Sequence, residues 1–277
     1  MPMKTILLHV QADPRVTVRV ANAIRIAQVC NAHLEVLHVT PEGAMASFES
    51  FGGIDADRSG ERDFIASEDE LEREVRGMLE KSGCDYEYER LVGSNIASLA
   101  TRAALADLLV AGRVAHVGSD KGAAIRTLGE LLTNLQIPIF VRGDDRDDFD
   151  PTAPAIIAWD GSFEAANAVR DGVFFLQKAR EVHVVRVSKD AQEVEPGMYP
   201  LTRVLEYLSR NDIHAEYSRI AEVDGLVSKA ILHFAERKGA GLIAMGAYTS
   251  SRLGQRLFGG MTRSMLKTCP VALLLAH

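Results

Sequence analysis

The sequence predicts an α/β protein made of two doubly wound domains in tandem, each with a five-stranded parallel sheet covered by helices. Three observations support this. Short apolar runs alternate with longer amphipathic segments, the runs are too apolar for strands with one wet face, and the first half of the pattern returns in the second half. Right-handed crossovers would then place a ligand crevice beyond the carboxyl ends of the strands, where the strand order reverses.

The first half contains five strand-like runs separated by helix-like segments. The expected strands are 4–10, 33–39, 85–91, 107–111 and 137–141, and the expected helices are 16–30, 68–81, 94–104 and one before the last strand. Residues 42–60 interrupt this order with a long stretch rich in glycine and small residues. Such a stretch is typical either of a mobile lid or of a disordered or partner-covering excursion.

The second half repeats the order at an offset of about 149 residues. Its expected strands are 155–159, 181–187, 214–220, 241–245 and 270–275, and its expected helices are 162–178, 201–210, 225–238 and one opening at Gly259-Gly260. The segment between the halves is acidic and ends in proline, which is typical of a solvated hinge. We therefore expect domains at 1–142 and 155–277, joined by a linker at 143–154.

Composition favours an ordinary cytoplasmic protein. The 277 residues are 47% apolar and 25% charged, with a net charge of −7, so nothing indicates nucleic-acid binding. The amino terminus shows no signal pattern, and no apolar run reaches the roughly 18 to 20 residues of a membrane span. Cys30, Cys84 and Cys269 are odd in number and lack CxxC spacing, which predicts buried reduced thiols rather than disulfides or a zinc site.

The stretch from Gly246 to Thr262 is the predicted ligand site. It leads from an apolar strand through a loop rich in glycine and hydroxyl residues to a helix, and free backbone N–H groups at a helix start favour phosphate. Arg252, Arg256 and Arg263 could neutralise that charge. Their spacing equally fits the wet face of an amphipathic helix.

The whole chain resembles a tandem universal stress protein, and the second half is the closer match. The resemblance rests on AWDGS at 158–162, MGAY from Met245, FGGMT at 258–262 and the ending CPVALLLAH. It implies an adenine nucleotide alpha hydrolase-like fold and a regulatory nucleotide in the second half. It also implies a pseudo-dimer within one chain, and it leaves homodimerisation open.

The nucleotide-binding branch of that family carries Gly-x2-Gly-x9-Gly-Ser/Thr in this loop. Gly246 and Gly259 match the first and third glycines, whereas Thr249 stands at the second and Gly260 replaces Ser/Thr. A β-branched residue resists a positive φ, so the backbone at Thr249 must differ or be strained by about 1 kcal/mol or more. The hydroxyl of Thr262 is the nearest substitute for the one missing at Gly260.

Two further positions follow from the resemblance. Asp160 matches the acidic residue that accepts from the ribose or adenine, and Val187 matches the residue whose backbone meets adenine. Asp160 equally fits a turn or N-cap role before the helix from Ser162. The resulting set of nucleotide-binding residues is Ala158, Trp159, Asp160, Val187, Met245, Gly246, Thr249, Arg252, Gly259, Gly260, Met261 and Thr262.

The expected ligand is ATP, ADP or AMP, with magnesium only alongside ATP, and no efficient turnover. The chain has no Gly-x4-Gly-Lys-Ser/Thr loop, no identifiable general base near the site and no Gly-x-Ser-x-Gly nucleophile. The spacing of its histidines suggests neither a catalytic triad nor a metal site.

The first half is a degenerate copy in this interpretation. Gln11 stands where Asp160 does, and the glycine motif cannot be recovered after Gly112. Gly118 and Gly122 are weak phosphate-loop material and fit a surface turn better.

Two alternatives from other classes remain. The chain could be a scaffold that binds no nucleotide and pairs with a partner through 271–275 as an edge strand. It could also be a flavin protein on the same architecture, with Trp159 and Tyr248 as the candidate aromatic residues and bound colour as the test.

Overall fold

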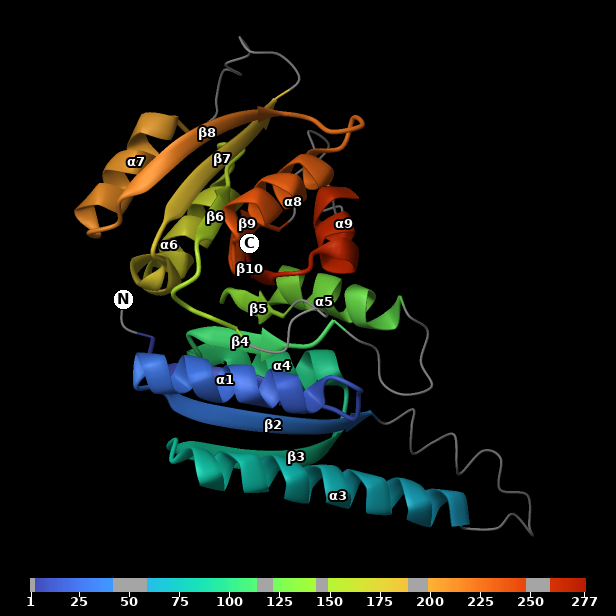
Figure 1. The fold of residues 1–277 in the computed structure, drawn as a ribbon. Coiled ribbons are helices and arrows are strands. Elements are labelled where there is room, and N and C mark those ends of the chain that lie inside the picture. The colour runs from blue at the N-terminus through green and yellow to red at the C-terminus, as the bar shows by residue number, and fades with distance from the viewer. Residues whose placement is uncertain (1–2, 42–58, 114–121, 143–148, 189–198, 248–259) are drawn as a thin grey trace. The chain divides into compact units, whose positions relative to one another are not determined.

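A computed structural model describes residues 3–41, 59–113, 122–142, 149–188, 199–247 and 260–277 (Figure 1). The described residues form two compact units, one within Met3–Leu131 and one within Leu132–His277. Each unit has parallel strands with helices packed on them, so the predicted doubly wound α/β class is confirmed. Several predicted positions lie outside the described residues: most of the stretch 42–60, and Gly118, Tyr248, Thr249, Arg252, Arg256 and Gly259.

The first unit has the strand order β3-β2-β1-β4, and the pairs β3-β2, β2-β1 and β1-β4 are all parallel. The order reverses between β1 and β4. Its elements are β1 (Thr5–Val10), α1 (Val16–Cys30), β2 (His33–Pro41), α3 (Ser59–Ser82), β3 (Tyr86–Gly93), α4 (Asn95–Arg102), a 3-10 turn (Ala103–Leu105), β4 (Leu108–Ala111) and most of α5 (Ala123–Asn134).

The second unit has the strand order β5-β10-β9-β6-β7-β8, and the order reverses between β6 and β9. In Figure 1, α6 and α7 lie on one face of its sheet and α8 and α9 on the other. Its elements are β5 (Ile139–Val141), β6 (Ala155–Ala158), α6 (Phe163–Lys178), β7 (Val182–Ser188), α7 (Leu201–Arg210), β8 (Ala215–Ala221), α8 (Val227–Lys238), β9 (Leu242–Gly246), α9 (Gly260–Thr268) and β10 (Ala272–Ala276).

One strand departs from the all-parallel expectation. β5 pairs antiparallel with β10, with Phe140 opposite Leu274, while β9 pairs with the other side of β10. The apolar strand at 271–275 is therefore not an edge strand, and the prediction that it could serve as a pairing edge for a partner was wrong. The sequence could not reveal this, because an interior strand and a pairing edge share the same apolar composition.

The end of the expected linker is part of the core of the second unit. Phe149 is buried, with its ring centroid 4.9 Å from that of Phe140 and 6.0 Å from that of Phe175. Further along, a β-carbon on Gly241 would stand 2.6 Å from the β-carbon of Ala153. Phe149, Ala153 and Pro154 thus pack against the second unit, whereas Asp150 and Thr152 remain exposed.

Helix α3 begins nine residues before the predicted start. From Glu68 onward its buried positions follow helical spacing, with Leu71, Val75 and Leu79 on the same face. The described side chains before Glu68 are exposed or half-buried, so this part of the helix carries no buried stripe that a pattern search would detect.

Candidate functional site at the carboxyl edge of the second unit

Three strands of the second unit bring predicted site residues together where the strand order reverses. Ala158 at the end of β6 pairs with Val185 of β7 on one side and with Met245 of β9 on the other. The Trp159 backbone N–H then donates to the Val185 carbonyl at 2.9 Å, and Val187 follows two residues along β7. This convergence of strand ends is the position at which doubly wound sheets bind ligands.

Asp160 shapes the turn that leads into α6. Its Oδ1 accepts from the backbone nitrogen of Ser162 at 2.9 Å and from the Ser162 hydroxyl at 2.6 Å, while Gly161 takes a φ of 83°. Ser162 in turn caps α6 by accepting from the backbone nitrogen of Ala165. The turn and capping role considered for Asp160 is therefore present. Both contacts use Oδ1, and Oδ2 has no hydrogen-bond partner among the described residues. The side chain is exposed to solvent.

Gly246 is required by packing as well as by the motif. A β-carbon there would stand 2.6 Å from the backbone nitrogen of Ala165 and 2.8 Å from the carbonyl carbon of Glu164. The first turn of α6 thus lies directly against the end of β9. Any larger residue at Gly246 must push this turn away from the sheet.

The start of α9 has the opposite character. Gly260 is exposed, and a β-carbon on it would meet nothing within 4 Å. Met261 is half-buried, whereas Thr262 is 4% exposed and lies on the buried face of the helix with Met265 and Leu266. The hydroxyl of Thr262 is therefore not on the solvent side of the helix. Of the expected arginines, only Arg263 is described, and it is exposed.

Sequence reasoning missed Tyr199, which lies beside the turn at Asp160. Its backbone N–H donates to the Gly161 carbonyl at 2.9 Å, and its half-exposed ring makes an edge contact with buried Trp159 at a centroid distance of 6.4 Å. The sequence before Tyr199 has no pattern from which the hydrogen bond between Tyr199 and Gly161 could be predicted. Tyr199 is therefore an addition that only the structure shows, and the set of nucleotide-binding residues itself stays a prediction.

The matching edge of the first unit holds buried polar groups instead of an exposed carboxylate. Gln11, at the position equivalent to Asp160, accepts from the side-chain amide of Asn95 at 3.2 Å. His9 is buried beside Asn95, and its Nε2 has no hydrogen-bond partner among the described residues. Burial, together with the nearby charge of Arg19, lowers the pKa of His9 to about 3, so this imidazole is neutral near pH 7.

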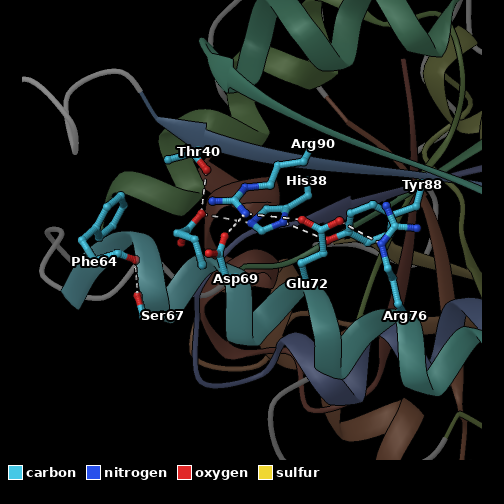
Figure 2. A network of polar contacts seen from close by, with 10 residues as sticks. His38, Thr40, Phe64, Ser67, Asp69, Glu72, Arg76, Tyr88 and Arg90 are labelled. Carbon is cyan, nitrogen blue, oxygen red and sulfur yellow. Dashed lines mark hydrogen bonds and ion pairs between the residues drawn. The ribbon is translucent and has the colours of Figure 1, made fainter. Parts of the chain in front are cut away.

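A second polar cluster of the first unit links α3 to strands β2 and β3 through hydrogen bonds (Figure 2). Buried Glu68 of α3 accepts from the Thr40 hydroxyl at 2.6 Å and lies 3.0 Å from His38 Nε2, both through Oε2. The other ring nitrogen of His38 lies 2.8 Å from the hydroxyl of Tyr88. His38 is fully buried, so this cluster holds a helix in place rather than receiving a ligand.

Charged groups continue this cluster along α3 (Figure 2). Arg90 of β3 donates to Asp69 at 2.6 Å, and Arg76 donates to Glu72 at 2.8 Å while its guanidinium stacks over the ring of Tyr88. Burial opposes ionisation of Glu72, but the hydrogen bonds from Arg76 and Arg90 hold its pKa below the usual value. Burial and the charge of Glu72 raise the pKa of Tyr88, so its phenol remains protonated.

No group of three or more His, Cys, Asp or Glu side chains within the described ranges is arranged to hold a metal ion. The helices described by the structure also include none long and apolar enough to cross a membrane. Of the three cysteines predicted to be buried, Cys269 is buried, whereas Cys30 and Cys84 are half-buried.

Comparison with known proteins bears on the second half directly. The family model described as the Universal stress protein family matches residues 154–277. The second half of the chain is a universal stress protein domain. The family-model match begins at Pro154, just before β6, and contains every predicted nucleotide-binding position.

Solved structures extend the likeness of fold to the whole chain. A universal stress protein from Archaeoglobus fulgidus DSM 4304 matches at 17% identity and a TM-score of 0.72, covering 100% of this chain and 99% of that chain. A functionally unknown protein, PA1789 from Pseudomonas aeruginosa PAO1, matches at 15% identity and a TM-score of 0.60, covering 99% and 92%. A search of curated proteins finds no significant match. At these identities the structural matches establish the fold alone. Both halves have this fold, and the universal stress protein domain is the second of the two.

Proposed function

We propose that the universal stress protein domain in the second half binds an adenine nucleotide, ATP, ADP or AMP, as a regulatory ligand without efficient turnover. The observation that carries the proposal is the convergence of β6, β7 and β9 at the reversal of strand order, with exposed Asp160 at that edge. Crevices at such reversals are the usual ligand sites of doubly wound sheets.

Each part of the nucleotide has a group suited to it. The free Oδ2 of Asp160 would accept from ribose hydroxyls, and the backbone near Val187 would meet the adenine ring. The half-exposed ring of Tyr199, beside buried Trp159, adds an aromatic surface at the same turn. Phosphates would lie at the amino terminus of α9, where Gly260 is exposed and backbone N–H groups have no intrahelical partner.

The side chains described near Asp160 support the part of the proposal that concerns turnover. Asp160 is tied to Ser162 through one oxygen, and the described residues around it include no histidine paired with a carboxylate that could serve as a general base. Magnesium would enter together with ATP, because the phosphates of the nucleotide supply oxygen ligands to the ion. Three free thiols accord with a reducing, cytoplasmic setting.

Fluorescence of Trp159 tests the proposal, because it is the only tryptophan and directly precedes Asp160. Titration with ATP should give a saturable change in the parent protein and a much weaker response in Asp160→Asn. Asparagine keeps the oxygen that accepts from Ser162, so the turn survives and only the charge is lost. Asp212→Asn is the matched control, since Asp212 is exposed before the amino end of β8. A flat response in the parent would contradict the proposal and favour a scaffold that binds no nucleotide.

A further inference from the structure

Arg19 is a buried cation at the carboxyl edge of the first unit. Its Nε donates to the backbone carbonyl of His9, the penultimate residue of β1, at 2.9 Å, and its Nη2 donates to Asp13 Oδ2 at 2.7 Å. The exposed fractions of the two paired side chains are 4% for Arg19 and 0% for Asp13. The other oxygen of Asp13 accepts from the backbone nitrogen of Arg15 at 2.9 Å, so the carboxylate is also fixed in place.

The guanidinium of Arg19 lies over the backbone of Gly112. A β-carbon on Gly112 would stand 2.0 Å from Nη1 and 3.0 Å from Cζ of Arg19. Gly112 directly follows β4, and β4 pairs with β1 at the point where the strand order of this unit reverses. The side chain of Arg19 therefore occupies the place at which a doubly wound domain receives its ligand.

The second unit has no counterpart to this cation at the equivalent positions. The repeat offset aligns Arg19 with Ala168 and Asp13 with Ser162. Ala168 is fully buried and small, and Ser162 caps α6. At the corresponding glycine, Gly246, the atoms nearest to an added β-carbon are backbone atoms of Ala165 and Glu164 and the β-carbon of Glu164, so no charged group takes the place that the guanidinium of Arg19 has at Gly112.

We propose that the ion pair of Arg19 and Asp13 occupies the ligand position of the first unit and so prevents small anionic ligands from binding there. The choice between Arg19 in one repeat and Ala168 in the other then decides which half can take a ligand. The inference rests on the proposed nucleotide function only for the identity of the excluded ligand. The place itself fits a guanidinium group, because the carboxylate of Asp13 and the carbonyl of His9 both accept from it.

Replacement of Arg19 tests the proposal by chemical rescue. Arg19→Ala leaves Asp13 buried and unpaired, so the thermal midpoint of the first unit should fall by about 10 °C. Hydrogen exchange should show lost protection in peptides covering β1 and β4. Guanidinium chloride at about 10 mM should restore that protection, because the ion binds the folded state, whereas sodium chloride should not.

Two further variants complete the rescue experiment. Adding Asp13→Asn to Arg19→Ala should abolish the rescue, because the counter-charge is gone. Arg170→Ala, which removes an exposed arginine of α6, should show neither the loss nor the rescue. A folded Arg19→Ala protein that guanidinium does not protect, or protects no more than it protects Arg170→Ala, would overturn the proposal.

A second measurement applies if Arg19→Ala does not fold. Gly112→Ala in the parent should displace the guanidinium and reduce protection of β1 and β4, whereas Gly77→Ala should not, since its β-carbon would meet nothing within 4 Å. Equal exchange in these two variants would overturn the proposal. Both experiments are run without nucleotide, so their failure is distinct from a failure of ATP to bind the second unit.

Discussion

Gly246 at the end of β9 lies so close to α6 that a β-carbon on it would stand 2.6 Å from the backbone nitrogen of Ala165. The residue that opens the predicted phosphate loop is therefore also the contact on which the first turn of α6 rests. That turn begins just after Asp160 and Ser162, so packing at Gly246 positions the acidic residue of the site.

Gly246→Ala should destabilise the second unit by about 1 to 3 kcal/mol, because the added methyl must move backbone atoms rather than a flexible side chain. Urea unfolding followed by Trp159 fluorescence measures this directly. Gly260→Ala is the matched control, and its stability should stay within about 0.5 kcal/mol of the parent because its surroundings are open. Equal losses in the two variants would show that α6 does not rest on Gly246.

Gly260→Ser should tighten nucleotide binding by about 2- to 10-fold, the worth of one added hydrogen bond to phosphate. Space for the side chain exists, since a β-carbon at Gly260 meets nothing within 4 Å. Calorimetric titration of ATP into both proteins measures the gain. Gly260→Ala tests whether the hydroxyl is responsible, and an alanine variant that binds as tightly as the serine variant would argue against a phosphate contact.

The stability of the first unit should decrease as the pH falls below the ordinary histidine pKa of about 6.5. The folded pKa of His9 is about 3, so the unfolded chain binds the extra proton between these two values and folding is penalised there. The contribution of His9 is fully present above pH 6.5, and about 2 kcal/mol of it is lost by pH 5. Hydrogen exchange of β1 at pH 7 and pH 5 should show this loss in the parent and a smaller one in His9→Gln. Exposed His214 offers the control, and a His9→Gln protein as acid-sensitive as the parent would refute the assignment.

Phe149→Ala should destabilise the second unit by about 3 to 5 kcal/mol, since it empties a ring-sized space beside the stacked rings of Phe140 and Phe175. Phe163→Ala is a suitable control because that ring is 83% exposed. Unfolding followed by Trp159 fluorescence distinguishes the two. A neutral Phe149→Ala would mean that the residues before β6 act as a solvated linker after all.

Glu68→Leu should cost the first unit about 2 to 4 kcal/mol, because it leaves the buried hydroxyl of Thr40 and the ring of His38 without their acceptor. Glu70 lies on the exposed side of the same helix, so Glu70→Leu should be nearly neutral. Hydrogen exchange of β2 and α3 reports the difference. Similar protection in both variants would show that the cluster in Figure 2 does not hold α3 in place.

Much of the fold could be predicted because hydrophobic periodicity determines the helices and strands locally. The helices at Val16–Cys30 and Leu201–Arg210 have the bounds that their apolar spacing indicates. The partner of a strand is not a local property, so the antiparallel pairing of β5 with β10 left no trace in the sequence. Composition likewise concealed burial of Phe149, one aromatic residue within an acidic stretch.

The site was predictable where chain order and strand register decide it. Asp160 and Gly246 lie at the same edge of the sheet, at the reversal of strand order, because Asp160 follows β6 and Gly246 ends the neighbouring β9. The contact of Tyr199 with Trp159 and the ion pair of Arg19 with Asp13 were not predictable. The first depends on the path of the chain between β7 and α7, and the second depends on the direction of a long side chain. A buried arginine also resembles, in sequence, the arginine of any amphipathic helix.

The most direct measurement is a calorimetric titration of the intact protein with ATP. The account predicts saturable binding of one ATP per chain, reduced at least tenfold by Asp160→Asn, which corresponds to about 1.4 kcal/mol, and unchanged by Asp212→Asn. An absence of binding heat from folded protein over a range of temperatures, or a stoichiometry of two, would contradict it.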